Sequence, residues 1–388
     1  MKRLADELES KKTDYLYRKR VVREGQQDPI IFIDGKKAIS FCGNNYLGLA
    51  NHPAVIQTFI DGANKYGVGS GSSNLISGYT SAQKILEEEL ANKLNSERVL
   101  VFNSGYFANI GTILSLTKKS SLVLADKLNH ASLVDACKYS EAKFIRYQHG
   151  DLKHLSHYLR SNQSLEKLIV SDTVFSMDGD IVDIESLVNL SKKFSTPLML
   201  DDAHGFGIFG PNGLGIAEKY KVEVQMATFG KALGTFGAFI AGSETLIEHL
   251  IQTARTYIYT TAMPPAIAEA TRTSLKLLDS ESWRREKLME LVAYFKKGAN
   301  ALDLPVINSD TPIQPLIVGS ADKVVQLSSM LLDNGIHIAA IRPPSVPEGT
   351  SRLRITITAS HETEHIDYLF DVFSTLRKAK IFKKILYK

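Results

Sequence analysis

The sequence has few cysteines and no long apolar run. Only Cys42 and Cys137 occur among 388 residues, too few for the disulfide framework of a small secreted domain, so a reducing compartment is expected. No apolar stretch approaches the roughly 18 residues of a membrane-spanning helix, and none is predicted. Residues 1–9 carry too many charges for a signal peptide, so we expect a cytoplasmic protein.

Excess charge of one sign is also missing. The formal net charge is +4, and the Lys and Arg residues are dispersed apart from short groups at 18–20 and in the C-terminal tail. This pattern disfavours nucleic-acid binding. The Gly-rich stretch 67–73 lacks the Gly-Lys-Ser/Thr ending of a P-loop and follows no predicted strand, so we interpret it as a flexible active-site loop. No metal site is predicted.

What the sequence does contain is an alternation of short apolar strands and amphipathic helices. It predicts strands at 98–102, 121–126, 143–147 and 167–172, each followed by a helix, which favours an α/β fold with a mainly parallel sheet. We also expect a helix over 4–20, a hairpin over 30–41 and a strand over 336–341. The predicted domains are an N-terminal arm (1–45), a large domain (46–282) and a small domain (283–388).

An acid, a histidine and a lysine follow two neighbouring predicted strands. One apolar run ends in Asp201-Asp202-Ala203-His204-Gly205, and the next ends in Thr228-Phe229-Gly230-Lys231. Open α/β sheets build their sites at the carboxyl ends of such strands. A buried carboxylate needs a cationic partner, and a protonated pyridine nitrogen is one. These residues are the parts needed to hold a pyridine cofactor through a Schiff base on Lys231.

Other candidate residues also have a purely structural interpretation. Ser104-Gly105-Tyr106 opens a helix, so it is either a phosphate seat or a plain turn. His130, and the pair Asp172 and Ser176, follow strands and could be functional or structural. Alternation places Arg352 and Arg354 on one face of a strand, where one could clamp a carboxylate or both could lie at the surface.

Taken together, the motifs resemble the α-oxoamine synthases, fold-type-I enzymes that depend on pyridoxal 5'-phosphate (PLP). The resemblance is carried in order by Asn44–Leu49, Ser104-Gly105, Asn129–Leu133, Phe175–Gly179, Asp201–Gly205, Thr228–Lys231 and Thr358–His361. It implies a large domain with a mainly parallel seven-stranded sheet flanked by helices, a smaller α+β C-terminal domain, and a homodimer with shared active sites.

Members of this family join an amino acid to an acyl thioester and release CO2. The stretches Ser70–Gly78, Tyr259–Pro265 and Ile341–Thr350 resemble the members that use L-alanine and a pimeloyl thioester, on coenzyme A or acyl carrier protein, in biotin biosynthesis. The nearest alternative joins glycine to acetyl-CoA. An ordinary aminotransferase and a catalytically silent PLP-fold subunit are more distant alternatives.

The resemblance also implies roles for individual residues. The implied catalytic set is Lys231 as Schiff-base lysine and proton carrier, Asp201 at the ring nitrogen, His130 stacked on the ring, and His204. The phosphate and the phenolic oxygen would be bound by Ser104, Gly105, Tyr106, Thr228, Ser176 and His204, with Thr260 or Thr261 reaching from a partner subunit. The substrates would be bound by Asn44, Arg354, Ser345 and either Arg18 or Arg20. Asn74 and Asp172 depart from the residues of many relatives, and their roles stay open.

Overall fold

The computed structural model describes residues 1–162 and 165–378. The described chain forms two compact units. The first comprises Met1–Gly48, Met177–Asp180 and the chain from Trp283 onward, and the second comprises Leu49–Ser176 and Ile181–Ser282. The division into an N-terminal arm (1–45), a large domain (46–282) and a small domain (283–388) stays a prediction.

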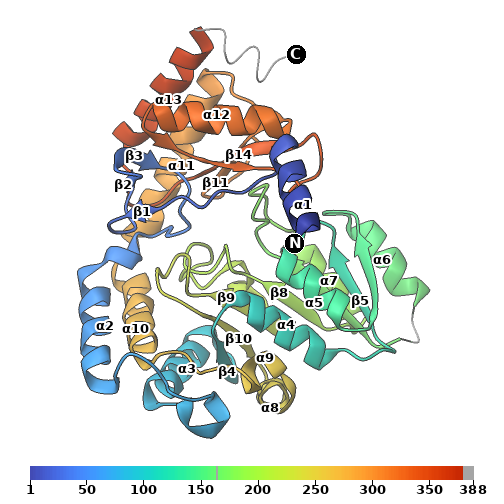
Figure 1. Cartoon of the computed structure of the whole chain (residues 1–388). Coiled ribbons are helices and arrows are strands. Elements are labelled where there is room, and N and C mark those ends of the chain that lie inside the picture. The colour runs from blue at the N-terminus through green and yellow to red at the C-terminus, as the bar shows by residue number, and fades with distance from the viewer. Residues whose placement is uncertain (163–164, 379–388) are drawn as a thin grey trace. The chain divides into compact units, whose positions relative to one another are not determined.

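A seven-stranded sheet forms the centre of the second unit, in the order β4-β10-β9-β8-β7-β5-β6 (Figure 1). Its strands are β4 (Arg98–Phe102), β5 (Leu122–Asp126), β6 (Lys143–Tyr147), β7 (Lys167–Asp172), β8 (Leu198–Asp201), β9 (Val224–Thr228) and β10 (Ala238–Gly242). Strand β10 is antiparallel to both β4 and β9, and the other pairs are parallel. The predicted mainly parallel seven-stranded sheet is therefore confirmed.

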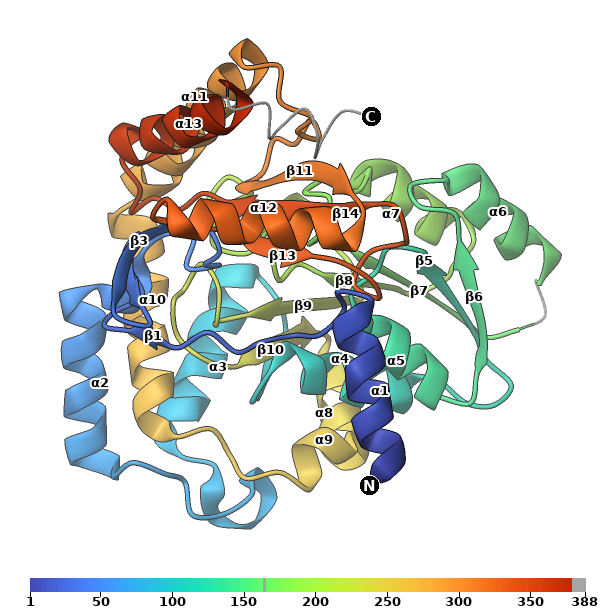
Figure 2. The ribbon, with the colours of Figure 1, turned by 45° about the horizontal axis from the view of Figure 1, so that its top comes forward.

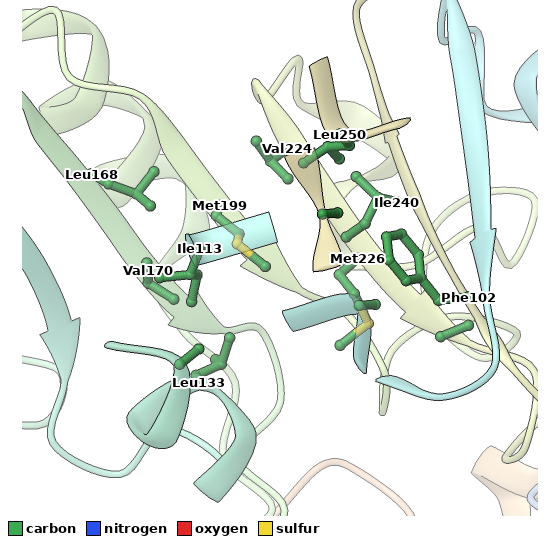
Figure 3. Packing of buried hydrophobic residues seen from close by; sticks show 14 of the residues in the cluster. Phe102, Ile113, Leu133, Leu168, Val170, Met199, Val224, Met226, Ile240 and Leu250 are labelled. Atoms are coloured by element: carbon green, nitrogen blue, oxygen red, sulfur yellow. The ribbon is translucent and has the colours of Figure 1, made fainter. Parts of the chain in front are cut away.

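Helices cover both faces of this sheet. The helices of this unit are α2 (Pro53–Tyr66), α3 (Ser81–Leu94), α4 (Gly105–Leu116), α5 (Ala131–Tyr139), α6 (Leu152–Ser161), α7 (Ile184–Lys193), α8 (Glu244–Thr253), α9 (Arg255–Ile258) and α10 (Pro265–Ser280), of which α2 packs on α10. Val123 belongs to the core cluster shared with α4, α5 and α8, whereas Leu122 packs with α6 and α7. Figure 3 shows the first of these clusters, with Met199 and Met226 among its members. Successive strand residues are thus buried on opposite faces, which explains the nearly continuous apolar runs.

The first unit contains two smaller sheets. One has the order β1-β2-β3-β12 and the other the order β11-β14-β13. The elements are α1 (Lys2–Thr13), β1 (Arg23–Glu24), β2 (Ile30–Ile33), β3 (Lys36–Ser40), α11 (Trp283–Ala301), β11 (Ile313–Gly319), α12 (Ala321–Asp333), β12 (Ile336–His337), β13 (Ala339–Ile341), β14 (Ser351–Thr356) and α13 (Thr363–Lys378). Helix α12 packs on the second sheet, as Figure 2 shows, and α11 packs against α13.

Two predicted elements of the first unit were wrong in extent. The helix expected over 4–20 ends at Thr13, because Tyr15 adopts a left-handed conformation with φ 57°. Arg18 therefore lies outside the helix. The strand expected over 336–341 is divided: β12 pairs with β3, and β13 pairs with β14. This single apolar run therefore contributes a strand to each of two sheets, and its periodicity alone does not predict the division.

The segment 177–180 is held in the first unit by two local features. The Asp178 carboxylate forms a salt bridge with Arg352 of β14. Gly179 has φ 73°, and a Cβ atom there would lie 2.4 Å from the carbonyl oxygen of Ile313, so glycine is required by both conformation and space.

Two kinds of feature are absent from the described residues. None of their helices combines the length and apolar character needed to cross a membrane. They also contain no group of three or more His, Cys, Asp or Glu side chains placed to hold a metal ion.

Candidate active site

A cavity of about 170 Å³ lies at the carboxyl ends of the parallel strands in the second unit. It is lined by Gly105, Tyr106, Asn109, His130, Ser132, Asp172, Asp201, Ala203, His204, Met226, Thr228 and Lys231. The structure thus brings together seven of the predicted site residues, which come from four strand ends distant in sequence. Ser104, Ser176, Thr260 and Thr261 belong to the same unit but do not line this cavity.

Asp201 is the last residue of β8, and only 4% of it is exposed. Its Oδ1 accepts a hydrogen bond from the Ala203 N–H (3.0 Å), and its Oδ2 accepts one from Nδ2 of Asn109 (2.8 Å). Both neighbours are donors, so the carboxylate is oriented as an acceptor in a site that can offer it a cation.

Asp202, the second acid of the motif, has a structural task. It is completely buried, accepts hydrogen bonds from the Thr173 hydroxyl and the Ala217 N–H, and does not line the cavity. Burial raises its pKa to about 6 despite these hydrogen bonds. A Cβ atom on Gly215, where φ is 100°, would lie 1.9 Å from Asp202 Oδ2. The Gly-rich turn therefore wraps around Asp202, while Asp201 faces the cavity.

His130 is positioned by a loop that is fastened to the neighbouring strand. Asn129 donates from Nδ2 to the Val170 carbonyl, and its Oδ1 accepts the N–H of Asp172. The backbone N–H of His130 donates to Asp172 Oδ2 at 2.6 Å. His130 then caps helix α5, with its Nδ1 accepting the N–H of Ser132. These bonds hold the imidazole at the cavity wall.

The charges around the cavity influence one another. The His130 ring is accessible from the open cavity, but surrounding protein atoms still desolvate it and lower its pKa; Asp201 opposes this shift and Lys231 adds to it. Burial, followed by the Asp201 carboxylate, raises the pKa of Asp172 well above its ordinary value. The His130 backbone N–H and the Lys231 charge oppose this rise in the Asp172 pKa.

The first turn of helix α4 has the features of a phosphate-binding site. Ser104 is its N-cap residue, and its hydroxyl accepts the N–H of Phe107 at 3.2 Å. Gly105 and Tyr106 begin the helix and line the cavity, and N–H groups at such positions have no intrahelical partner. The Tyr106 hydroxyl is directed elsewhere, to Asp135. The backbone rather than the tyrosine side chain therefore suits an anion.

The threonines expected near this turn already have hydrogen-bond partners within the chain. The Thr228 hydroxyl donates to the Gly237 carbonyl (2.7 Å), so it would have to exchange that partner to donate to a phosphate. Thr260 Oγ1 and the Thr261 carbonyl accept from Nδ2 of Asn103, the residue before Ser104. They adjoin the phosphate turn without lining the cavity.

The predicted substrate residues lie in the first unit. Arg354 is 6% exposed and donates to Oδ1 of Asn44 (3.1 Å) and to the Thr356 hydroxyl (3.0 Å). Arg352 is bound instead to Asp178 and to the Met177 carbonyl. The structure thus separates the two arginines: Arg352 anchors a loop, and Arg354 is associated with Asn44.

Arg18 and Ser345 are exposed in the same unit. Arg342 fastens the chain beside Arg18 by donating to the carbonyl of Tyr17, and the Arg18 charge adds to the desolvation that lowers the Arg342 pKa. The Ser345 N–H donates to the Arg342 carbonyl. Arg18 and Ser345 are therefore associated through Arg342.

Sequence reasoning missed Asn109 and Ser132. Both are buried and polar, and both line the cavity. A signal was present, because each is a polar residue on a helix face that otherwise packs into the core. Asn109 lies one turn after Gly105, so it shares that helix face.

The side chains around the cavity fit PLP. A buried carboxylate suits the cationic ring nitrogen, a lysine suits an aldehyde, and a helix N-terminus suits a phosphate. All three line one cavity, at Asp201, Lys231 and Gly105.

Comparisons with known proteins agree with this arrangement. Residues 36–373 match the family described as aminotransferase class I and II. A protein of Thioalkalivibrio sulfidiphilus named 8-amino-7-oxononanoate synthase is 48% identical over 377 residues, with 96% of both chains covered. A protein of that name from Saccharophagus degradans is 47% identical, and the match covers 97% of this chain and 96% of the other.

Solved structures show the same relationship. Serine palmitoyltransferase from S. paucimobilis, with a bound PLP–myriocin aldimine, has a TM-score of 0.92 at 28% identity, with 97% of both chains covered. An 8-amino-7-oxononanoate synthase from Francisella tularensis has a TM-score of 0.77 at 30% identity, covering 89% of this chain and 99% of the other. The chain therefore belongs to the class I and II aminotransferases and, within them, to the α-oxoamine synthases.

Proposed function

We propose that this protein is an 8-amino-7-oxononanoate synthase, which condenses L-alanine with a pimeloyl thioester and releases CO2 and the free thiol carrier. The carrier is coenzyme A or acyl carrier protein, and the reaction belongs to biotin biosynthesis. The observation that carries the proposal is near-half identity, along almost the whole chain, to proteins of that name. The cavity supports it by joining Lys231, Asp201 and His130.

PLP is the proposed cofactor, and when bound it supplies an electron sink for a carbanion at the amino-acid Cα. Lys231 would hold it covalently, and Asp201 would pair with its ring nitrogen. His130 would stack on the ring. The phenolic oxygen would be bound by Ser176 and His204, and the phosphate by Ser104, the N–H groups of Gly105 and Tyr106, Thr228, and Thr260 or Thr261 of a partner subunit.

Different residues of this chain would then act on the two substrates. Asn44 and Arg354 would hold the alanine carboxylate and so orient the Cα–H bond. Lys231 Nζ would take the Cα proton and return a proton to that carbon after CO2 has left. His130, kept neutral by its surroundings, would donate to the thioester carbonyl oxygen. Arg18 and Ser345 would contact the acyl chain.

We also propose a cytoplasmic homodimer. Its support is the exposed apolar surface of helix α2, where Phe59 and Ile60 are 41% and 45% exposed, and the two free cysteines, which suit a reducing compartment. Neither nucleic acid nor a membrane is a proposed partner.

A substrate panel tests the function. Purified holoenzyme is given pimeloyl-CoA or pimeloyl-acyl carrier protein with alanine, glycine or serine, and CO2 and free thiol are measured. We expect alanine to give by far the highest kcat/KM, with one CO2 released per thiol. Faster turnover of glycine with acetyl-CoA would refute the proposal in favour of the glycine acetyltransferase, and nitrogen transfer without CO2 would indicate an aminotransferase.

The carboxylate clamp makes a separate prediction. Arg354→Ala should raise the KM for alanine roughly 10- to 100-fold, because a charge-assisted hydrogen bond to the substrate is lost. Arg377→Ala, which removes an arginine from helix α13, is the control and should leave KM unchanged. An unaltered KM in Arg354→Ala would place the clamp elsewhere.

A further inference from the structure

A chain of hydrogen bonds links Asp201 to His130 through two residues that have no assigned role. Nδ2 of Asn109 donates to Asp201 Oδ2 (2.8 Å) and to Oγ of Ser132 (2.9 Å). Oγ of Ser132 lies 2.7 Å from Nδ1 of His130. Asn109 is completely buried and Ser132 is 1% exposed, so water does not compete for these bonds.

The direction of each bond follows from Asp201. Its carboxylate is an acceptor, so the Asn109 amide must turn its NH2 group toward it. The same NH2 group supplies the second proton to Ser132 Oγ. Oδ1 of Asn109 is then buried without a hydrogen-bond partner among the described residues. The orientation of the amide is therefore fixed by the two hydrogen bonds that its NH2 group donates.

Ser132 passes this direction on to the imidazole. Its oxygen already accepts from Asn109, so its hydroxyl proton is available for Nδ1 of His130. The Ser132 backbone N–H also points at that nitrogen (3.2 Å). Two donors face Nδ1, so in the neutral ring the proton belongs on Nε2.

We propose that Asn109 and Ser132 are positioning residues that fix His130 as its Nε2–H tautomer, and thereby keep a hydrogen-bond donor available for a substrate oxygen in the cavity. The assignment of the substrate oxygen rests on the proposed function, but the tautomer does not. The lowered pKa of His130 supports the neutral ring that a tautomer requires. The Asp201 carboxylate, which accepts from the Ala203 N–H and from Asn109, sets the direction of the bonds in this network.

The tautomer can be observed without any substrate. Holoenzyme labelled with 15N at its ten histidines is studied by long-range 1H–15N NMR, and the signals of His130 are identified by their loss in His130→Gln. We expect a bare Nδ1 and a protonated Nε2. A protonated Nδ1 in the wild-type holoenzyme would overturn the proposal.

Variants test the chain of hydrogen bonds from Asp201 through Asn109 and Ser132 to His130, which we call the relay. Asn109 bonds to Ser132 and Asp201, so Asn109→Ala can reach His130 only through them, and we expect a larger fraction of the Nδ1–H form. Thr112→Val is the matched control: Thr112 lies one turn further on the same buried helix face, and its hydroxyl has no hydrogen-bond partner within the described residues. It should leave the tautomer unchanged. A wild-type tautomer ratio in Asn109→Ala would contradict the relay.

Kinetics add a second readout. Ser132→Ala should lower kcat about 10-fold with the KM for alanine unchanged, since one hydrogen bond to the proton donor is lost, and Ser132→Thr should restore most of it. If Ser132→Thr does not restore kcat, the Ser132 hydroxyl is not the group that positions His130. If the tautomer is as expected but alanine and pimeloyl thioester are not condensed, the proposed function is refuted and the relay is not. If they are condensed but His130 carries its proton on Nδ1, the relay is refuted and the proposed function is not.

Discussion

Replacing Lys231 by alanine should lower condensation by about 10⁴-fold or more, because one residue is assigned both covalent attachment of the cofactor and transfer of the Cα proton. Lys231 lies three residues beyond the end of β9 and lines the cavity with Asp201 and His130. The variant should still bind PLP through the other contacts, but without a covalent bond. Borohydride reduction followed by peptide mapping should therefore label the peptide containing position 231 in the wild type only.

Two controls separate the roles of this lysine. Lys127→Ala removes an exposed lysine from the turn after β5 and should change neither labelling nor rate. Small primary amines added to Lys231→Ala should restore part of the proton transfer, with a rate that rises with the basicity of the amine. Unchanged covalent labelling of the variant would exclude Lys231 as the attachment site.

The strands and the turns that follow them could be predicted from the sequence because the information is local. The predicted strands at 98–102, 143–147 and 167–172 coincide with β4, β6 and β7. Strands β4 and β7 are apolar runs followed by a polar turn, and the parallel arrangement then places such turns at one edge of the sheet. Lys231, Asp201 and His204 could be grouped on this basis without knowledge of any contact.

Contacts that depend on the direction of side chains could not be predicted. Asp201 and Asp202 are adjacent and carry the same side chain, and only the pleat of β8 and the turn around Asp202 distinguish the one that lines the cavity. Arg352 and Arg354 share a strand face, yet the Asp178 carboxylate selects Arg352 as its partner. Asp178 belongs to the segment 177–180, which is distant in sequence from β14. The alternation of side chains along β14 therefore does not predict which of the two arginines binds Asp178.

The substitution Asp201→Asn should have the second largest effect, a loss of about 10³-fold in kcat with the phosphate contacts preserved. A carboxylate stabilises the cationic ring nitrogen that makes the cofactor an electron sink, and a neutral amide does not. PLP affinity, measured by equilibrium dialysis, should fall much less than kcat, because the helix N-terminus at Gly105 and Tyr106 is untouched. Wild-type turnover by this variant would refute the assigned role of Asp201.

The same substitution should also disturb His130, although the two side chains share no hydrogen bond in the structure. The backbone N–H of Ala203 will retain the amide oxygen at position 201, so the new NH2 group faces Asn109. Asn109 must then turn its oxygen toward that group, and the same oxygen faces the Ser132 hydroxyl and draws its proton away from His130 Nδ1. The Nε2–H tautomer should lose its preference in Asp201→Asn and keep it in Asp202→Asn, since Asp202 bonds to Thr173 and Ala217 outside this network. An unchanged His130 tautomer in Asp201→Asn would show that the cofactor contact alone accounts for the role of Asp201.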